Sequence, residues 1–319
     1  MTKKLASTIP GSEVAYLFPG QGVQVVGMGQ QLHDSSPAAR SVFHAVDEAL
    51  NRPLSNLMFA GPSETLRETI NAQPAIMAVS LACITAMQEQ LGQEAMPKPA
   101  MMAGHSLGEY TALAVAGVLT VGETAWLVQE RGRLMQEACD ITPGGMAAVL
   151  GLDRMTIEEI SRETGTYVSN VNTPGQIVIS GERMVLAQAL DMAMARGARK
   201  AMPLSVGGAF HSGLMEPARE GLVQAVGKLV FKDPTVPIVA NCTGKPLTKA
   251  EDVRKELIAQ IANCVEWEMS MNFIIKSGIS QFVEVGPGKA LSGMIKRISR
   301  SAKILSVSDM DSILNLSKN

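Results

Sequence analysis

The serine at position 106 lies in a pattern typical of an activated nucleophile. Residues 104–108 read Gly-His-Ser-Leu-Gly and match G-x-S-x-G, with an apolar stretch before them and helix-forming residues after them. This context predicts a strand, a sharp turn that exposes the Ser106 hydroxyl, and a helix. The backbone N–H of Leu107 would then lie at the helix N-terminus, where an oxyanion is stabilised. The alternative is that Ser106 only caps the helix, although a cap does not need glycines on both sides.

A serine hydroxyl is a weak nucleophile until a base accepts its proton, and the chain has four histidines that could do so. His33 and His44 fall in a polar helical pattern that is typical of a solvated face. His105 lies inside the turn beside the serine, with its side chain expected to point away from the hydroxyl. His211 follows a glycine-rich stretch at the edge of a predicted cleft, and it is therefore the expected base. The alternative for His211 is a residue that merely starts a helix.

An arginine lies on the apolar stripe of a predicted helix over residues 121–139. This helix begins with a capping box, and Arg131 stands four residues from both Leu127 and Met135. A guanidinium that faces the core is always charged and needs an anionic partner, and its planar fork suits a carboxylate. The partner could be an acidic side chain of the protein or a carboxylate of the substrate, and the helical pattern leaves both open.

The elements that must position these residues alternate between strands and helices. Apolar segments that end in turn residues occur at 14–18, 100–103, 236–240 and 281–285. This alternation predicts a parallel sheet with helices on both faces. Residues 144–206 instead follow the order βαββαβ of a ferredoxin-like unit. We therefore expect an α/β-hydrolase-like large domain (13–142 and 207–319), an inserted ferredoxin-like small domain (143–206), a cleft between them and a flexible leader (1–12).

The composition excludes several classes of protein. The 319 residues are 46% apolar and 18% charged, as in an ordinary globular chain, and 28 Lys and Arg against 30 Asp and Glu give a net charge of -2. This balance and an aromatic content of 4% argue against a nucleic-acid or membrane partner. The four cysteines form no C-x-x-C pair, so we expect no metal site. No apolar run approaches the ~18 residues of a membrane span, and no signal peptide is evident, which predicts a cytoplasmic protein. One core accounts for the apolar stripes, so we expect a monomer.

From Val14 to about Lys303 the chain resembles the malonyl-CoA:acyl carrier protein transacylases and the related acyltransferases of polyketide synthases. The segments that carry this resemblance are Phe18-Pro19-Gly20-Gln21-Gly22, Gln73-Pro74-Ala75, Gly104-His105-Ser106-Leu107-Gly108-Glu109-Tyr110, Arg131-Gly132, Asn172-Thr173-Pro174-Gly175-Gln176, Ala209-Phe210-His211-Ser212 and Val283-Glu284-Val285-Gly286-Pro287-Gly288.

The resemblance implies a role for each matching residue of the catalytic apparatus. Ser106 would be acylated, with His211 as its base. The backbone N–H groups of Gln21 and Leu107 would form the oxyanion hole. The main-chain carbonyl of Gln260 would orient the histidine, a task that an aspartate performs in many other serine enzymes.

The same resemblance implies that the substrate is a malonyl group. Arg131 would hold its free carboxylate, and Phe210 after Ala209 matches the malonyl-selecting members, in which a bulky side chain would crowd a 2-methyl group. A methyl group is worth only about 1–3 kcal/mol of discrimination, so the selectivity should be good but not absolute. The chain departs from the common pattern at Val23 and Cys264, which lie outside the expected chemistry.

The implied reaction is a ping-pong transfer. Malonyl-CoA acylates the serine, and the phosphopantetheine thiol of an acyl carrier protein then takes the malonyl group, with no cofactor. The motifs are shared by fatty-acid and polyketide synthesis. Two other functions remain possible: a serine acyl-thioester hydrolase (an editing acyl hydrolase), and a catalytically silent subunit that binds acyl thioesters or carrier proteins.

A basic cluster on and after the last helix could steer an acidic carrier protein or could be a solvated face: Lys289, Lys296, Arg297, Arg300 and Lys303.

Overall fold

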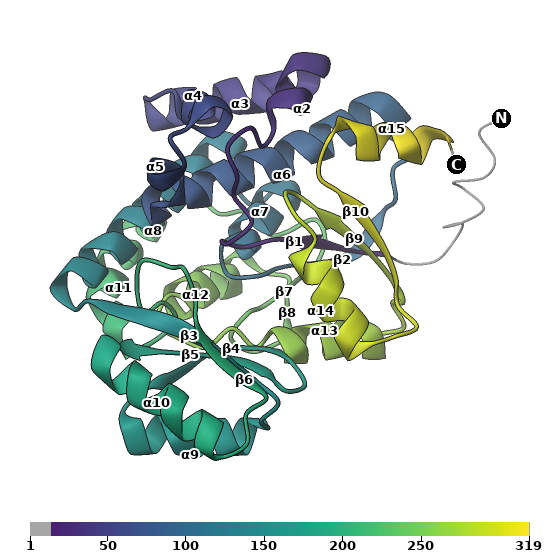
Figure 1. The fold of residues 1–319 in the computed structure, drawn as a ribbon. Helices are drawn as coiled ribbons and strands as arrows, with labels where there is room; N and C mark the ends of the chain where they lie inside the picture. Colours follow the sequence, from purple (N-terminus) through teal and green to yellow (C-terminus); the bar gives the residue numbers. More distant parts are fainter. Residues whose placement is uncertain (1–13, 319) are drawn as a thin grey trace.

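The computed structural model of the chain describes residues 14–318 (Figure 1). The expected leader, residues 1–12, lies outside the described residues. Within them the chain forms a larger, mostly parallel sheet and a smaller antiparallel sheet. The predicted combination of an α/β core with a second, smaller layer is therefore confirmed.

The larger sheet has six strands in the order β10-β9-β1-β2-β7-β8. Only β8 runs antiparallel to its neighbour, β7, and the other pairs are parallel. All five residues of the central strand β1 are buried, as expected for a strand covered on both faces. The strands are β1 (Val14–Phe18), β2 (Pro99–Gly104), β7 (Ile238–Val239), β8 (Pro246–Leu247), β9 (Gln281–Val285) and β10 (Lys303–Val307).

Alternate side chains of β1 enter two different cores. Tyr16 and Phe18 pack in the main core with the helices on one face, and Ala15 and Leu17 pack on the other face with α13 and α14. The sheet thus separates two helical layers (Figure 1). The helices of this part are α2 (Gln30–Ser35), α3 (Pro37–Leu50), α4 (Leu54–Ala60), α5 (Ser63–Arg67), α6 (Thr69–Leu91), α7 (Leu107–Val115), α8 (Val121–Ile141), α11 (Glu216–Gly227), α12 (Ala250–Gln260), α13 (Trp267–Lys276), α14 (Ala290–Ile298) and α15 (Met310–Lys318).

One described helix, α6, is long and apolar enough to cross a membrane by length and composition alone. This corrects the expectation that no apolar run approaches that length. The most apolar window of α6 is 83% buried inside the protein, where the helix packs against α3, α7 and α8. Its apolar surface is therefore covered by other helices, as in the central helix of a globular core.

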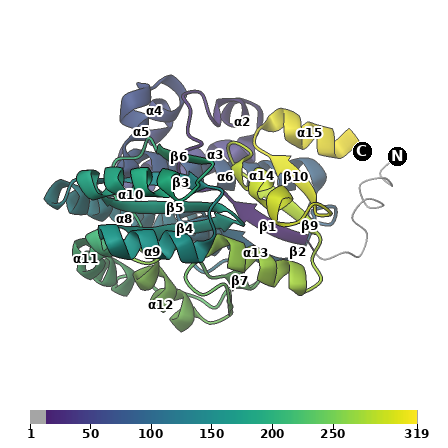
Figure 2. The same ribbon diagram turned by 60° about the horizontal axis from the view of Figure 1, so that its bottom comes forward.

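The smaller sheet has the strand order β4-β5-β3-β6, with every pair antiparallel. Helices α9 and α10 cover its outer face (Figures 1 and 2). The predicted βαββαβ unit is confirmed, although its last strand ends at Pro203 instead of Val206; one further backbone bond to β3, from the Leu204 N–H to the Met146 carbonyl at 2.9 Å, follows it. The elements are β3 (Gly144–Leu150), α9 (Arg154–Thr164), β4 (Tyr167–Thr173), β5 (Gln176–Glu182), α10 (Arg183–Ala195) and β6 (Lys200–Pro203).

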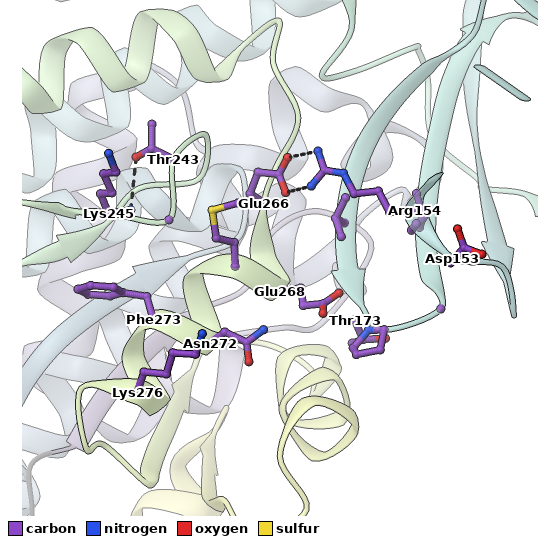
Figure 3. Close-up of a pocket in the computed structure, with 16 residues that line it drawn as sticks. Asp153, Arg154, Thr173, Thr243, Lys245, Glu266, Glu268, Asn272, Phe273 and Lys276 are labelled. Atoms are coloured by element: carbon purple, nitrogen blue, oxygen red, sulfur yellow. Dashed lines mark hydrogen bonds and ion pairs between the residues drawn. The ribbon is translucent and has the colours of Figure 1, made fainter. Parts of the chain in front are cut away.

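The inner face of the smaller sheet packs into the main core, and its β4 edge is also hydrogen-bonded to the rest of the protein. The backbone of Val265 donates to Ser169 (2.8 Å) and accepts from Val171 (2.9 Å). Next to this bridge, both Nη atoms of Arg154 donate to the Glu266 carboxylate at 2.9 Å, on the wall of a cavity of about 690 Å³ between the small sheet and α13 (Figure 3). The backbone bridge and the ion pair fix the β4 edge relative to the larger sheet.

Candidate active site

The predicted strand, sharp turn and helix around Ser106 are confirmed: Ser106 lies between β2 and α7 with φ 52° and ψ -106°. A non-glycine residue in this region costs on the order of 1–3 kcal/mol. A Cβ on Gly104 would lie 1.8 Å from the backbone of Gly108, and a Cβ on Gly108 would lie 2.0 Å from the Phe18 carbonyl oxygen. Close backbone packing therefore explains both glycines. The Ser106 hydroxyl makes no capping hydrogen bond, so the alternative of a simple helix cap is wrong.

His211 lies where the expected base must lie. Its Nε2 is 2.7 Å from the Ser106 Oγ, although the two residues are 105 positions apart. Its Nδ1 lies 2.9 Å from the main-chain oxygen of Gln260. A carbonyl only accepts, so Nδ1 carries the proton and donates it, which leaves Nε2 free to accept the serine proton. The partner that orients the histidine is thus the Gln260 carbonyl, in the position that the resemblance implied.

Burial keeps the His211 imidazole neutral. Its side chain is nearly inaccessible to solvent, and desolvation together with the nearby charge of Arg131 lowers its pKa from 6.5 to about 3. The hydrogen bond to the Gln260 carbonyl opposes this shift but does not overcome it. A neutral imidazole is the form that accepts a proton, so His211 is ready to act as a base at neutral pH.

This shift predicts how stability depends on pH. Since the folded pKa of His211 lies below the unfolded value, the unfolded chain binds more protons between pH 6.5 and about 3. The free energy of unfolding should therefore fall as the pH falls through this window, by about 2 kcal/mol at pH 5 from this one group. Urea unfolding of the wild type and of His211→Gln at pH 8 and pH 5 measures the difference. Identical pH dependence in the two proteins would contradict the assignment.

Arg131 lies in the same site, with its guanidinium fully buried. Nη1 donates to Gln73 Oε1 at 2.6 Å, and Nη2 donates to Gln260 Oε1 at 2.9 Å and to Ser106 Oγ at 3.1 Å. The group also lies over the ring of Tyr110, 5.2 Å from its centroid. These partners are all uncharged. A buried cation held only by neutral groups beside the serine is suited to receive the carboxylate of a substrate.

A structural salt bridge was the other interpretation of Arg131, and it is not observed. Among residues 14–318 no carboxylate forms an ion pair with this guanidinium. Arg131 is connected to the carboxylate of Glu109 through the side-chain amide of Gln260. In contrast, Arg133 lies on the solvent-exposed face of α8, where it is half-exposed and pairs with two glutamates of the same helix.

The two expected oxyanion donors belong to segments that touch each other. Leu107 is the first residue of α7, where backbone N–H groups lack an acceptor within the helix. Gln21 lies in the turn after β1, and this turn packs against the serine segment so closely that a Cβ on Gly20 would lie 2.6 Å from the His105 carbonyl oxygen. The Gln21 side chain accepts a hydrogen bond from Thr69. Their role as an oxyanion hole stays a prediction.

A cavity of about 230 Å³ opens next to this site between the two sheets. The larger sheet contributes Gln21 and His105, and the smaller sheet contributes Asn172 and Leu204 near its two edges. His105 points away from the Ser106 hydroxyl, as expected, and its Nε2 donates to Asn172 Oδ1 at 2.8 Å. The predicted cleft thus has a counterpart in the structure, and its walls come from both sheets.

Two other expectations concern the surroundings of the site. Phe210 is buried in the main core beside the base, and its selectivity role stays a prediction. In the basic cluster, Lys296 donates to the carbonyl of Ala302 and Arg297 contacts Gln176, the first residue of β5. These two side chains therefore have structural partners, and steering of a carrier protein stays a prediction.

Three buried polar residues around the serine were not assigned any role from the sequence. Gln73 accepts a hydrogen bond from Arg131 directly, a contact that its sequence segment alone does not indicate. Asn241 accepts from the backbone N–H of Ser106 at 2.7 Å, and Glu109 accepts from both Asn241 and Gln260. A signal existed for Asn241 alone, because it follows a strand at the carboxyl edge of the sheet, where functional residues gather.

Comparison with known proteins gives consistent results. The model of the family described as "Acyl transferase domain" matches residues 15–316. The malonyl CoA-acyl carrier protein transacylase of Bacillus subtilis is 41% identical over 307 residues, which cover 95% of each chain, and that of Escherichia coli K12 is 40% identical over 291 residues, 90% of this chain and 93% of that one.

Solved structures are similar throughout the chain. An acyl-carrier-protein-S-malonyltransferase from Bartonella henselae has a TM-score of 0.91 and 40% identity, covering 96% of this chain and 98% of its own. A malonyl-transacylase in complex with a type II PKS acyl-carrier protein has a TM-score of 0.90 and 38% identity, covering 97% of this chain and 100% of its own.

Proposed function

The chain belongs to the acyl transferase family, and from this premise we propose the reaction that its site performs. The enzyme transfers the malonyl group of malonyl-CoA to the phosphopantetheine thiol of an acyl carrier protein, through a malonyl ester of Ser106. The observation that carries this assignment is the position of the Ser106 Oγ. It lies 2.7 Å from a neutral imidazole and 3.1 Å from a buried guanidinium that has no ion-pair partner among the described residues.

In the first half-reaction His211 Nε2 takes the proton of Ser106 while Oγ attacks the thioester carbonyl. The resulting oxyanion lies against the backbone N–H groups of Gln21 and Leu107. When the C–S bond breaks, the CoA sulfur leaves with the proton from His211. In the second half-reaction the carrier-protein thiol gives its proton to His211 and its sulfur attacks the ester carbonyl. The C–O bond to Ser106 then breaks, and His211 returns the proton to Oγ, which restores the free serine and the neutral imidazole.

Arg131 gives the reaction its acyl specificity. The malonyl carboxylate is separated from the ester carbonyl by one methylene, so its counter-ion must lie close to the serine. The 3.1 Å between Nη2 and Oγ meets this requirement. As the carboxylate binds, it replaces neutral contacts of a desolvated cation, and the low-dielectric surroundings strengthen the new ion pair.

A mass measurement separates transfer from the two other functions. The purified protein is incubated with malonyl-CoA and weighed intact, and phosphopantetheinylated carrier protein is then added. We expect Ser106 to gain one malonyl group and to pass it to the carrier protein. Free malonate produced faster than malonyl carrier protein would indicate a hydrolase, and no mass gain would indicate a silent subunit.

Phe210 is proposed to limit the size of the acyl group. Its ring is buried in the core next to the base, so Phe210→Ala should open space beside C2 of the acyl chain. We expect the ratio of methylmalonyl to malonyl transfer to rise about 10-fold. Competition between the two CoA esters measures the ratio, and Phe231→Ala, which truncates another buried phenylalanine, is the control. The same ratio in the wild type and both variants would refute this role.

We also propose that the enzyme is a cytoplasmic monomer that needs no cofactor. The serine, imidazole and guanidinium supply the nucleophile, the base and the counter-ion, so the transfer requires no further chemical group. We infer the acyl carrier protein as partner from the relatives named above. Sedimentation equilibrium of the purified protein, alone and with its carrier protein, tests the oligomeric state.

A further inference from the structure

A buried carboxylate lies directly behind the serine and takes no part in the steps described above. Glu109 is fully inaccessible to solvent on the first turn of α7. Its Oε1 accepts from the backbone N–H of Asn241 at 2.9 Å and from Asn241 Nδ2 at 3.2 Å. Its Oε2 accepts from Gln260 Nε2 at 2.7 Å. One carboxylate therefore contacts two side-chain amides on opposite sides.

The first of these amides, Asn241, holds the strained backbone of the serine. Strands β2 and β7 pair only as far as Ala103 and Val239, two residues before Asn241. Beyond that point the side chain of Asn241 replaces the missing backbone partner: Nδ2 donates to the Gly104 carbonyl at 2.7 Å, and Oδ1 accepts from the Ser106 N–H at 2.7 Å. The carboxamide thus bridges the peptide groups on the two sides of the turn.

The second amide, Gln260, connects the serine to the other functional side chains. Its Nε2 donates to the Ser106 carbonyl at 2.9 Å, and its Oε1 accepts from Arg131 at 2.9 Å. Its main-chain oxygen accepts a hydrogen bond from His211 Nδ1. A rotation of this amide by 180° would turn an N–H group toward the guanidinium, where only an acceptor fits.

The direction of every hydrogen bond in this network is set at its two ends. Arg131 and the Ser106 N–H can only donate, so both amides must turn their oxygens outward to these groups and their NH₂ groups inward. The residue between them must accept from both sides. A carboxylate does this with two equivalent oxygens, whereas an amide would present its own NH₂ to one neighbour.

We propose that Glu109 is a positioning residue that fixes the orientation of Asn241 and Gln260, and through them aligns the nucleophile Ser106 with the guanidinium of Arg131. The carboxylate acts on the reaction only through these neighbours, since it does not reach the Ser106 hydroxyl. This role deepens the proposed function and rests on it only for the malonyl assay below.

The surrounding charges offer a matched control. Burial raises the pKa of Glu109 and the charge of Glu256 adds to this, while the N–H donors and Arg131 favour its charged form. Glu256 is also buried, and its Oε1 accepts from the backbone N–H of Cys242 at 2.7 Å, with the Cys242 thiol and the backbone N–H of Asn241 as further donors to its carboxylate. A glutamine at position 256 can still accept the bond from the Cys242 N–H with its own oxygen. Glu109→Gln and Glu256→Gln therefore remove a carboxylate from the same region, but only the first places an NH₂ group against the side-chain NH₂ group of Asn241 or Gln260.

The experiment measures the reactivity of Ser106 in two ways. Rates of malonyl-ester formation are followed by intact mass, and rates of labelling by a fluorophosphonate probe report on the serine without any malonyl group. Glu109→Gln should slow malonyl-ester formation about 10- to 100-fold, because the new NH₂ group at position 109 faces the NH₂ group of a neighbouring amide. Glu256→Gln should stay within about threefold of the wild type. Equal losses in both variants, or no loss in Glu109→Gln, would overturn the proposal.

A reciprocal change separates positioning from a general loss of structure. Asn241→Asp places a carboxylate against Glu109 and the Gly104 carbonyl, so labelling of Ser106 by the probe should fall at least about 10-fold. Adding Glu109→Gln to this variant removes one of the two opposed carboxylates and supplies an NH₂ donor opposite the other. The backbone N–H of residue 241 then loses its acceptor, so the recovery should be partial. The double variant should therefore label faster than Asn241→Asp alone, a result that a purely structural role does not produce. Additive losses would count against the proposal, as would wild-type labelling of Asn241→Asp.

The two readouts also distinguish this role from the proposed function. If malonyl-CoA fails to acylate the wild type while the fluorophosphonate still labels Ser106, the assigned reaction is wrong. The labelling rates of the four variants then still decide the role of Glu109. Circular dichroism and thermal unfolding of each variant give the folded fraction by which the rates are divided.

Discussion

Replacing His211 by alanine is expected to slow malonyl transfer to Ser106 by at least about 10³-fold. The side chain supplies the acceptor 2.7 Å from the serine Oγ, and its lowered pKa keeps that acceptor unprotonated at neutral pH. Without it the hydroxyl must lose its proton to water during the attack. Rapid-quench measurement of the malonyl ester at saturating malonyl-CoA reports this step.

The control for this prediction is His44→Ala, which removes an exposed imidazole on α3. It should transfer malonyl at the wild-type rate. A His211→Ala rate within 10-fold of the wild type would mean that another group accepts the serine proton. Since Gln260 acts on His211 through its main chain, that contact cannot be removed by changing the side chain.

The second large effect is expected for Arg131→Ala, and it should depend on the acyl donor. Loss of a desolvated ion pair with the malonyl carboxylate costs about 3–4 kcal/mol, which corresponds to roughly 10²- to 10³-fold in malonyl loading. Acetyl-CoA has no carboxylate, so its loading should be unchanged or faster. Arg131→Lys keeps the charge but loses the planar fork, and it should fall between the two.

Radiolabelled malonyl-CoA and acetyl-CoA, each offered alone to every variant, measure the two loading rates. Arg133→Ala is the matched control, because this arginine lies two residues further along α8 and is half-exposed. It should load both donors at wild-type rates. Equal losses of malonyl and acetyl loading in Arg131→Ala would show that the arginine supports the structure of the site and does not bind the carboxylate.

The parts of the site that the sequence predicts well are those with a local steric cause. The serine turn needs Gly104 and Gly108 because backbone atoms lie about 2 Å from where their Cβ atoms would be. Such a requirement is visible in five consecutive residues. The position of Arg131 is also visible locally, because helical periodicity alone places it on an apolar stripe.

The hydrogen-bond network behind the serine could not be predicted in this way. Glu109 reads as an ordinary helix former, and its partners Asn241 and Gln260 follow more than 130 residues later. Only the pairing of β2 with β7 brings Asn241 to the serine turn. The direction of each bond depends on what lies at the far end of the network, and no local pattern encodes that. Helix α6 shows a related limit, since burial by neighbouring helices and not its own composition decides its environment.

The attachment of the smaller sheet has a mechanical consequence for how substrates enter. On one side of the cavity, Val178 of β5 is buried in the main core and Leu204 after β6 packs against that core. On the other side, Asn172 of β4 accepts from His105 next to the nucleophile. Both walls are therefore anchored to the larger part of the protein. A pantetheine arm that reaches Ser106 would enter an opening that is already formed, without a displacement of the smaller sheet.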